Sequence, residues 1–205
     1  MPVATLSRAI IAGNADVFHA IRDEDVSLAI WEKKAPSAIT NLPLTNIKNI
    51  RFQALLGELL VQLEAELDGA GYKRSVGRNM LITDISMLAN RFAAIMNLTG
   101  VEIRLEHVTT NACKKFHGDH VTARLICTYA GQGTQWLDSE NAADCDCGDP
   151  HNIRQLATGD VALFKGRLWS ADAPAIHRSP PIEGMGEERL VLVINPGATA
   201  GVQPI

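Results

Sequence analysis

The sequence predicts a mainly β protein of the α+β class, in which helices precede an antiparallel sandwich or barrel. The apolar residues recur at helical spacing before Gly100 and at every second residue after it. Beyond that glycine, seven short extended segments are separated by turns rich in Gly, Pro and Asp, as is typical of antiparallel sheets. With 205 residues, of which 46% are hydrophobic and 20% charged, the whole chain 1–205 is expected to fold as a single domain.

The N-terminal layer, about 26–98, is expected to contain one strand and two helices. VSLAIW (26–31) has the composition of a short strand, and as an edge strand it can pair with a second copy of the chain, which gives a possible homodimer. Apolar residues at spacings of three to five predict one helix over 47–67 and another over 83–98, with Gly100 as the terminator of the second helix.

The β core is expected over about 101–196. Alternate residues are apolar in VEIRLEHV (101–108) and VTARLICTY (121–129), so each segment should have one buried face. Five shorter segments of the same kind follow: TQWL, NIRQL, DVALF, APAIH and ERLVLVI.

Charge and hydropathy exclude several classes of partner. Lys and Arg number 19 against 23 Asp and Glu, and the net charge of -4 gives no general attraction to nucleic-acid phosphates or anionic lipid. No segment approaches the roughly 18 apolar residues of a membrane span, and the opening residues lack the pattern of a secretory signal. We therefore expect no nucleic-acid or membrane partner, and a cytoplasmic location in which the four cysteines are reduced thiols or metal ligands.

An H-x-D motif, His117 and Asp119, stands just before one of the predicted strands. Residues i and i+2 of an extended segment project in the same direction, so both side chains can face one ion while Gly118 leaves the opposite side unobstructed. His177, at the end of APAIH, is the best candidate for a third ligand. Two imidazoles and one carboxylate, with other positions open, form the facial triad of non-haem Fe(II) oxygenases. The alternative is an H-x-D that occurs by chance as ordinary polar residues.

The cysteines offer further ligands. Cys113 lies four residues before His117, and its coordination would favour Zn(II), whereas a buried small apolar residue is the more common fate of a free cysteine. In DCDCGDPH, the residues Cys145, Cys147 and His151 can hold a second soft ion. Their C-x-C-x3-H spacing is not a standard zinc pattern, and such a stretch is more often a polar surface loop.

The order of these motifs resembles the double-stranded β-helix of the Fe(II)- and 2-oxoglutarate-dependent dioxygenases, particularly the prolyl-hydroxylase-like branch. The strings CKKFHGDHVTARLICTYAGQGTQWL, LFKGRLW and HRSPPIEGMGEERLVLVI are similar to a bacterial family of unknown function that is often encoded near zinc-homeostasis genes. The resemblance covers about 26–196. It implies a cupin-like double-stranded β-helix (jelly roll) with the N-terminal helices packed on it.

The resemblance also implies an activity: an Fe(II)/2-oxoglutarate-dependent oxygenase, or hydroxylase, that acts on a small-molecule or peptide substrate. His117, Asp119 and His177 would bind the Fe(II). Because the same three residues also accept Zn(II), the competing class is a non-catalytic zinc-binding or zinc-homeostasis protein.

The 2-oxoglutarate site implied by the resemblance centres on Arg189, in ERLVLVI. Its guanidinium would pair with the distal carboxylate of 2-oxoglutarate, since the two groups match bidentately. Tyr129 and Arg124 are further candidates for lining this pocket. Arg178 is a rival carboxylate partner. The alternative for both Arg189 and Arg178 is a surface ion pair with the nearby glutamates, Glu183, Glu187 or Glu188.

Overall fold

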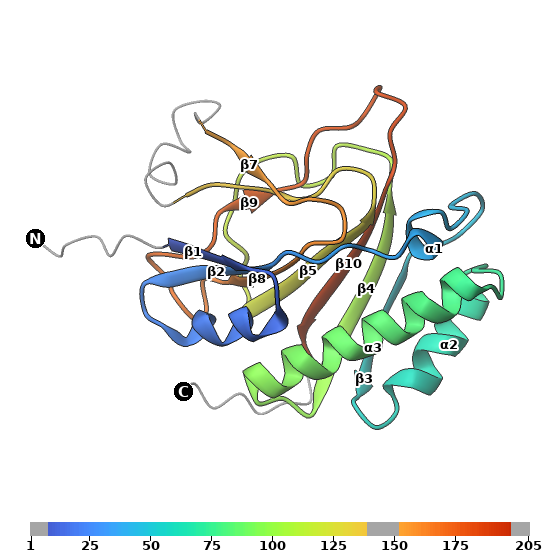
Figure 1. Ribbon diagram of the computed structural model, residues 1–205, viewed down its shortest axis with the longest axis horizontal. Helices are drawn as coiled ribbons and strands as arrows, with labels where there is room; N and C mark the ends of the chain where they lie inside the picture. The colour runs from blue at the N-terminus through green and yellow to red at the C-terminus, as the bar shows by residue number, and fades with distance from the viewer. Residues whose placement is uncertain (1–7, 139–151, 198–205) are drawn as a thin grey trace, which may run out of the picture.

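The computed structural model describes residues 8–138 and 152–197, and these residues form two β-sheets with helices on one side (Figure 1). The large sheet contains, in spatial order, β1 (Arg8–Ala12), β2 (Val26–Trp31), β8 (Val161–Lys165), β5 (Ala123–Ala130), β10 (Arg189–Pro196), β4 (Gly100–Val108) and β3 (Ile50–Leu55). The small sheet contains β7 (Arg154–Gln155), β6 (Gln135–Trp136) and β9 (His177–Arg178). All neighbouring strands are antiparallel except β1 and β2.

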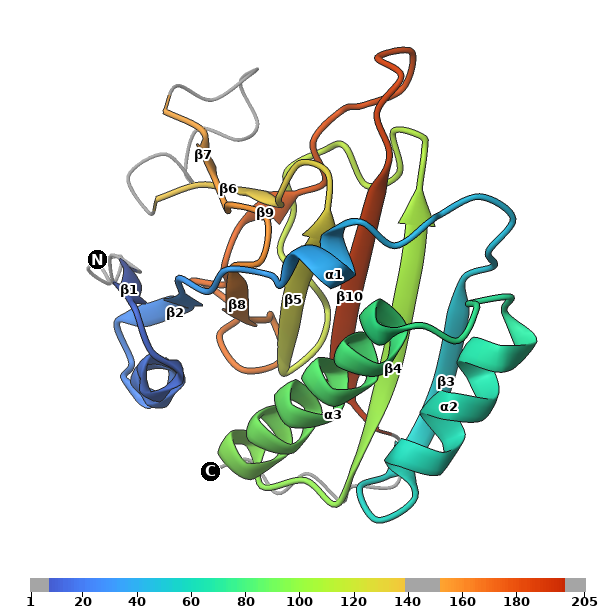
Figure 2. The same ribbon diagram turned by 45° about the vertical axis from the view of Figure 1, so that its right-hand side comes forward.

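The helices are η1 (Ala15–Arg22, a 3-10 helix), α1 (Ser37–Thr40), α2 (Leu59–Gly69) and α3 (Val76–Met96). Figure 2 shows α3 lying across β5, β10 and β4, with α2 beside it. The prediction of a sheet-rich protein with a helical layer is therefore confirmed.

The large sheet has two different faces, as the alternating apolar pattern predicted. On β5 and β10 every second residue enters the main core beneath α3, and all of these are 0% exposed: Ala123, Leu125, Cys127, Tyr129, Leu190, Leu192 and Ile194. The intervening residues face the small sheet, where Ile126, Val191 and Val193 belong to a second apolar cluster with Trp136 and Phe164. The sheet thus separates a helix-side core from a second interior, and the polar motifs lie in the second interior.

Helix α3 was predicted over 83–98, and it begins seven residues earlier. Ser75 caps its N-terminus by accepting a hydrogen bond from the backbone N–H of Arg78 (3.1 Å). The predicted terminator, Gly100, is instead the first residue of β4, because Asn97 takes the left-handed conformation (φ 54°) that ends the helix. Asparagine tolerates this conformation better than most residues, so the helix needs no glycine here.

The helix predicted over 47–67 is wrong in its first half. Residues Ile50–Leu55 form β3, which pairs with β4 along six residues, and only Leu59–Gly69 is helical. In IRFQAL, Ile50 and Ala54 are buried and Phe52 is half-buried, which is the period of a strand. The apolar residues of this short segment fit both periods, and pairing with β4 decides between them.

VSLAIW forms a strand, β2, but the prediction that it lies at an edge is wrong. It lies between β8 and β1, and β1 is the edge of the sheet. The sequence prediction missed β1 and η1, although Asn14 caps η1 by accepting a hydrogen bond from the N–H of Asp16 (3.0 Å).

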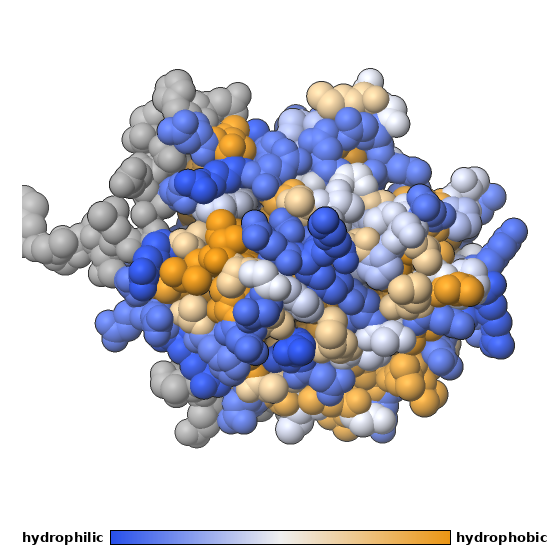
Figure 3. Space-filling model, viewed as in Figure 1, coloured by the Kyte–Doolittle hydropathy of each residue, from blue (hydrophilic) through white to orange (hydrophobic). Residues whose placement is uncertain are grey.

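The surface in Figure 3 is largely hydrophilic, with orange side chains gathered partly over the region of α2 and α3. Exposed apolar side chains on these two helices are Leu60, Val61, Val76 and Met80. In the described parts of the chain, no helix combines the length and the apolar character needed to cross a membrane.

Candidate metal centre

Two histidines far apart in the sequence lie directly opposite each other in the structure. His117 and His177 form an antiparallel bridge in which each backbone N–H donates to the other residue's carbonyl oxygen at 3.0 Å. Side chains of such a pair project on the same side of the backbone. Their ring centroids are accordingly 4.9 Å apart. The bridge joins the loop after β4 to β9 of the small sheet, so the backbone itself brings the two imidazoles together.

Asp119 projects toward both histidines. Its Oδ1 lies 3.5 Å from Nε2 of His117, and its Oδ2 lies 3.2 Å from Nε2 of His177. The candidate ligand atoms of the three residues are all within 4.8 Å of one another, and within residues 8–138 and 152–197 this is the one group of its kind. Asp119 and His177 are buried, and His117 is half-buried.

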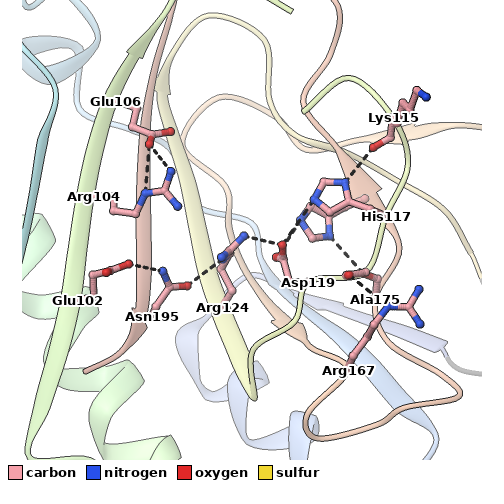
Figure 4. Close-up of polar contacts among 12 residues, drawn as sticks. Glu102, Arg104, Glu106, Lys115, His117, Asp119, Arg124, Arg167, Ala175 and Asn195 are labelled. Atoms are coloured by element: carbon pink, nitrogen blue, oxygen red, sulfur yellow. Dashed lines mark hydrogen bonds and ion pairs between the residues drawn. The ribbon is translucent and has the colours of Figure 1, made fainter. Parts of the chain in front are cut away.

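The protonation of both imidazoles is fixed by backbone carbonyls. Nδ1 of His117 donates to the carbonyl of Lys115 (2.8 Å), and Nδ1 of His177 donates to the carbonyl of Ala175 (3.2 Å), because a carbonyl oxygen only accepts (Figure 4). In each neutral ring, Nε2 therefore keeps a lone pair, and it points at the carboxylate of Asp119. Hydrogen bonds of this kind orient the histidines that bind metals.

This arrangement fits a divalent cation. Two nitrogen lone pairs facing a carboxylate repel it unless a proton or a cation lies between them. Moreover, Oδ2 of Asp119 is a buried oxygen that accepts no hydrogen bond from the described residues. A buried acceptor without a donor is costly, and a bound metal would satisfy it. The donor set of two imidazoles and one carboxylate suits first-row divalent ions.

The pKa values of the group follow from the same contacts. Burial alone would raise the pKa of Asp119, but contacts with His117 and His177 and the charge of Arg124 hold that pKa well below its usual range. The contact with Asp119 raises the pKa of His117, and burial opposes this effect. The carboxylate is thus kept ionised, as a metal ligand must be.

Gly118 is required by the packing behind the motif. A Cβ at this position would lie 2.8 Å from Cγ of Pro174, on the segment that leads to His177. The two ligand segments can therefore approach each other only if the residue between His117 and Asp119 has no side chain. This is the unobstructed side that the sequence pattern predicted.

A chain of side-chain hydrogen bonds holds Asp119 to the large sheet (Figure 4). Arg124 on β5 donates from Nη1 to Oδ1 of Asp119 (2.6 Å) and from Nε to Oδ1 of Asn195 (2.8 Å). The amide of Asn195 on β10 in turn donates to Glu102 on β4 (2.8 Å), which also pairs with Arg51 on β3. Arg124 does line the cavity, but its guanidinium is engaged with the metal ligand, so it positions Asp119.

Asn195 and Glu102 were not identified from the sequence. One signal could have indicated them: each is a polar residue on the same face of its strand as the residues that line the cavity. Their partners belong to other strands, however, and pairing between strands cannot be read from a single sequence.

Arg189 lies deep in the same interior, with 2% of its surface exposed. Its guanidinium donates to the carbonyl of Gln132 and to the hydroxyl groups of Ser179, Thr128 and Thr134. All of these acceptors are neutral, so the described residues provide no carboxylate for this cation. Burial lowers the pKa of Arg189 to about 10. The surface ion pair with glutamates, considered from the sequence, is not what the structure shows.

The two histidines of the candidate metal site and Arg189 line one cavity of about 110 Å³. Its apolar lining, the apolar floor, consists of Ile126 on β5 and Val191 and Val193 on β10. A buried cation and a candidate metal site thus face a shared apolar interior, which is the usual composition of a small-molecule site.

The prediction that Tyr129 lines this pocket is wrong. It lies on the opposite face of β5, is 0% exposed, and donates its hydroxyl hydrogen to Asp84 on α3 (2.8 Å). The alternation along the strand explains this position, because Tyr129 shares its parity with the core residue Cys127 and Arg124 does not.

The other predicted residues have different positions. Cys113 lines the cavity and is exposed, but it is not part of the three-residue group. Arg178 donates to Gln135 (2.7 Å), and its guanidinium lies 4.3 Å from the ring centre of Phe116. Cys145, Cys147 and His151 lie outside the described residues.

These observations define the protein as one with a two-sheet fold and a His–Asp–His cluster between the sheets. Residues 12–195 match the family described as a protein of unknown function, DUF1826, and the chain belongs to this family. A comparison with curated proteins gave no match.

Solved structures show the fold. A protein from Shewanella oneidensis, provisionally described as an oxygenase, has a TM-score of 0.51 and 9% identity, over 97% of this chain and 93% of that chain. A prolyl-4-hydroxylase from Pseudomonas putida has a TM-score of 0.47 and 10% identity, over 91% and 99%. The hydroxypropylphosphonic acid epoxidase from S. wedmorenis has 0.31 and 17%, over 46% of this chain and 42% of the epoxidase. This chain thus spans less than half of the epoxidase's length.

Proposed function

We propose that this protein is an Fe(II)- and 2-oxoglutarate-dependent oxygenase whose two sheets form a cupin-like double-stranded β-helix. The observation that carries the proposal is that both histidines of the His–Asp–His group line the same cavity as a buried arginine, Arg189, to which the described residues offer no carboxylate partner. The fold shared with the Shewanella protein is compatible with it, but fold alone does not establish an activity.

The three ligands leave room for a co-substrate. His117, Asp119 and His177 supply three donors, and the described residues contribute no fourth one to the group. A site with three protein ligands keeps positions open, as catalytic metal sites do. Fe(II) would supply the activation of O2 that couples oxidation of the 2-oxo acid to oxidation of the substrate.

Arg189 would bind the distal carboxylate of 2-oxoglutarate. The electrostatic argument is that every other basic side chain lining the cavity has an acidic partner: Arg124 pairs with Asp119, and Arg104 pairs with Glu106. In the described parts of the chain, Arg189 contacts only hydroxyl and carbonyl groups, so a dicarboxylate that enters the cavity would neutralise it. The hydroxyl oxygens of Thr128, Thr134 and Ser179 accept hydrogen bonds from the guanidinium, and their hydroxyl hydrogens would donate to the same carboxylate.

The competing function is that of a protein that binds or buffers Zn(II) without catalysis. The same cluster accepts Zn(II), and cellular metal supply partly decides which ion is bound. A non-catalytic site would close its coordination shell with a fourth protein ligand. Cys113 lines the cavity and was the candidate for such a fourth ligand, but it is outside the group.

Anaerobic titration of metal-free protein with Fe(II), and then with 2-oxoglutarate, tests the proposal. We expect a visible metal-to-ligand charge-transfer band that needs both additions and that is lost in His177→Ala. His107→Ala is the matched control, because His107 lies on β4, contacts Glu188 (2.8 Å) and is outside the cavity; this variant should keep the band. Tight Zn(II) binding at the same residues, without any such band, would refute the oxygenase and support the zinc function.

A further inference from the structure

A second pair of charged side chains lines the cavity and has no role at the metal centre. Arg104 and Glu106 are two residues apart on β4, so both project from the same face of the strand. Nε and Nη2 of Arg104 donate to one oxygen of Glu106, Oε1. Their side chains are 26% and 29% exposed, so both are accessible to a ligand in the cavity.

The position of the pair follows from the strand register. Arg104 is opposite Val193 and Glu106 is opposite Val191, while Arg189 is opposite Val108. The pair therefore flanks the apolar floor on which a molecule between the metal cluster and Arg189 would lie. A substrate that approaches such a co-substrate from the side of β4 would meet these two side chains.

Each member of the pair keeps a polar group available. The contacts of the guanidinium involve Nε and Nη2, and the contact of the carboxylate involves Oε1. Among the described residues, Nη1 of Arg104 and Oε2 of Glu106 make no hydrogen bond. Together they offer one donor and one acceptor beside each other, on a pair whose net charge is zero.

We propose that Arg104 and Glu106 form a subsite for an amide group of the substrate, which is a peptide or a carboxamide. An amide presents a carbonyl to Nη1 and an N–H to Oε2, so it binds without breaking the ion pair. For a carboxylate or an ammonium ligand, the attraction of one member of the pair is offset by the repulsion of the other, so a charged ligand gains little from the pair and loses its hydration. The inference rests on the proposed function, since that function assigns Arg189 to the anionic co-substrate and leaves a neutral subsite for the substrate.

The test follows the arginine Nε–H NMR signals of the full-length chain, with and without Zn(II). The signal of Arg104 is assigned from its loss in Arg104→Lys. The probes are N-acetylglycinamide, which is a neutral amide, glycine, which is a zwitterion, and succinate, which is a dianion. We expect N-acetylglycinamide to shift the Arg104 signal saturably. Glu106→Gln should weaken this binding about tenfold, because a charged acceptor is replaced by a neutral one.

Arg74→Gln is the matched control. Arg74 pairs with Asp68 on α2 at 3.1 Å and is remote from the cavity, so its loss should leave amide binding unchanged. The inference is overturned if glycine or succinate shifts the Arg104 signal more than N-acetylglycinamide does. It is also overturned if no amide produces a saturable shift at concentrations up to about 100 mM, where even weak recognition is visible.

This result is separable from that of the Fe(II) titration. If the charge-transfer band forms and the amide does not bind, the amide subsite is wrong and the oxygenase stands. If the amide binds at Arg104 and no band forms, the subsite stands as an amide-binding site, and the oxygenase is wrong.

Discussion

Replacement of Arg189 by methionine should strongly weaken the binding of 2-oxoglutarate and leave folding stability nearly unchanged. Burial lowers the pKa of Arg189 to about 10, which corresponds to a free-energy cost of about 3 kcal/mol for holding the charge in the fold. Against this, the guanidinium makes four hydrogen bonds to neutral acceptors, worth about 1 kcal/mol each. The two contributions nearly cancel, so Arg189→Met should change the free energy of unfolding by no more than about 1–2 kcal/mol.

The effect on binding should be much larger. Truncation of a buried arginine that pairs with a ligand carboxylate costs about 2–5 kcal/mol of binding free energy. The affinity for 2-oxoglutarate should therefore fall by roughly 30-fold to several thousand-fold. Urea unfolding measures the first quantity, and titration of the Fe(II) protein with 2-oxoglutarate measures the second. Binding of 2-oxoglutarate with unchanged affinity in Arg189→Met would refute the assignment. A loss of stability much above about 4 kcal/mol would show that the arginine has a structural role instead.

Three further changes test other parts of the structure. Gly118→Ala places a Cβ 2.8 Å from Pro174 and should weaken metal binding at least about tenfold, as measured by competition with a chromogenic chelator. Tyr129→Phe removes the hydrogen bond to Asp84 and should destabilise the fold by about 1–3 kcal/mol in urea unfolding without changing metal affinity. Glu102→Gln should flatten the acid-unfolding curve: the pKa of Glu102 is lowered in the fold, so its stabilisation exists above the unfolded pKa near 4.5 and is lost as the pH falls further.

For each of these three substitutions, a control variant or a result that would contradict the prediction can be named. Gly57→Ala adds a Cβ with no atom within 4 Å and should not affect metal binding. If Tyr129→Phe weakened binding of 2-oxoglutarate, the tyrosine would have to contact the cavity, against its position on the helix-side face. The sign for Glu102 follows from its contacts: burial would raise the pKa, but Asn195 and Arg51 together lower it. Identical acid-unfolding curves for the wild type and Glu102→Gln would contradict this.

The sequence was sufficient to predict which three residues come together as the candidate metal site. His117 and Asp119 are two residues apart, so their common direction follows from the geometry of an extended chain. His177 was proposed from its position at the end of a predicted strand, but its pairing with His117 across a bridge could not be predicted, because nothing in its own neighbourhood indicates that partner.

Errors occurred where local patterns support two structures. The apolar residues of 50–55 fit a helical and a strand period equally, and only the presence of β4 as a partner selects the strand. For Tyr129 the resemblance to dioxygenases conflicted with the alternation along VTARLICTY. The alternation was the more reliable guide, because a residue that lies two residues after a buried apolar residue of the same strand faces the same core.

The partners of the metal ligands could not be predicted, because they depend on register between strands. Arg124, Asn195 and Glu102 are hydrogen-bonded in a row only because β5, β10 and β4 are aligned so that these three residues are neighbours across the sheet. A shift of one residue in any strand would turn its polar group into the helix-side core.

The same register explains how one loop can hold a metal site between two sheets. The backbone of His117 is bonded to the small sheet through His177, while the side chain of Asp119 is bonded to the large sheet through Arg124. The loop is thus fixed to both sheets by the two residues that flank Gly118. A cation bound there would link the small sheet, the large sheet and the loop at a single point. The cavity beside that point is lined by apolar residues of the large sheet and by Arg104 and Glu106, so the residues that would hold a metal are distinct from those that would select a substrate.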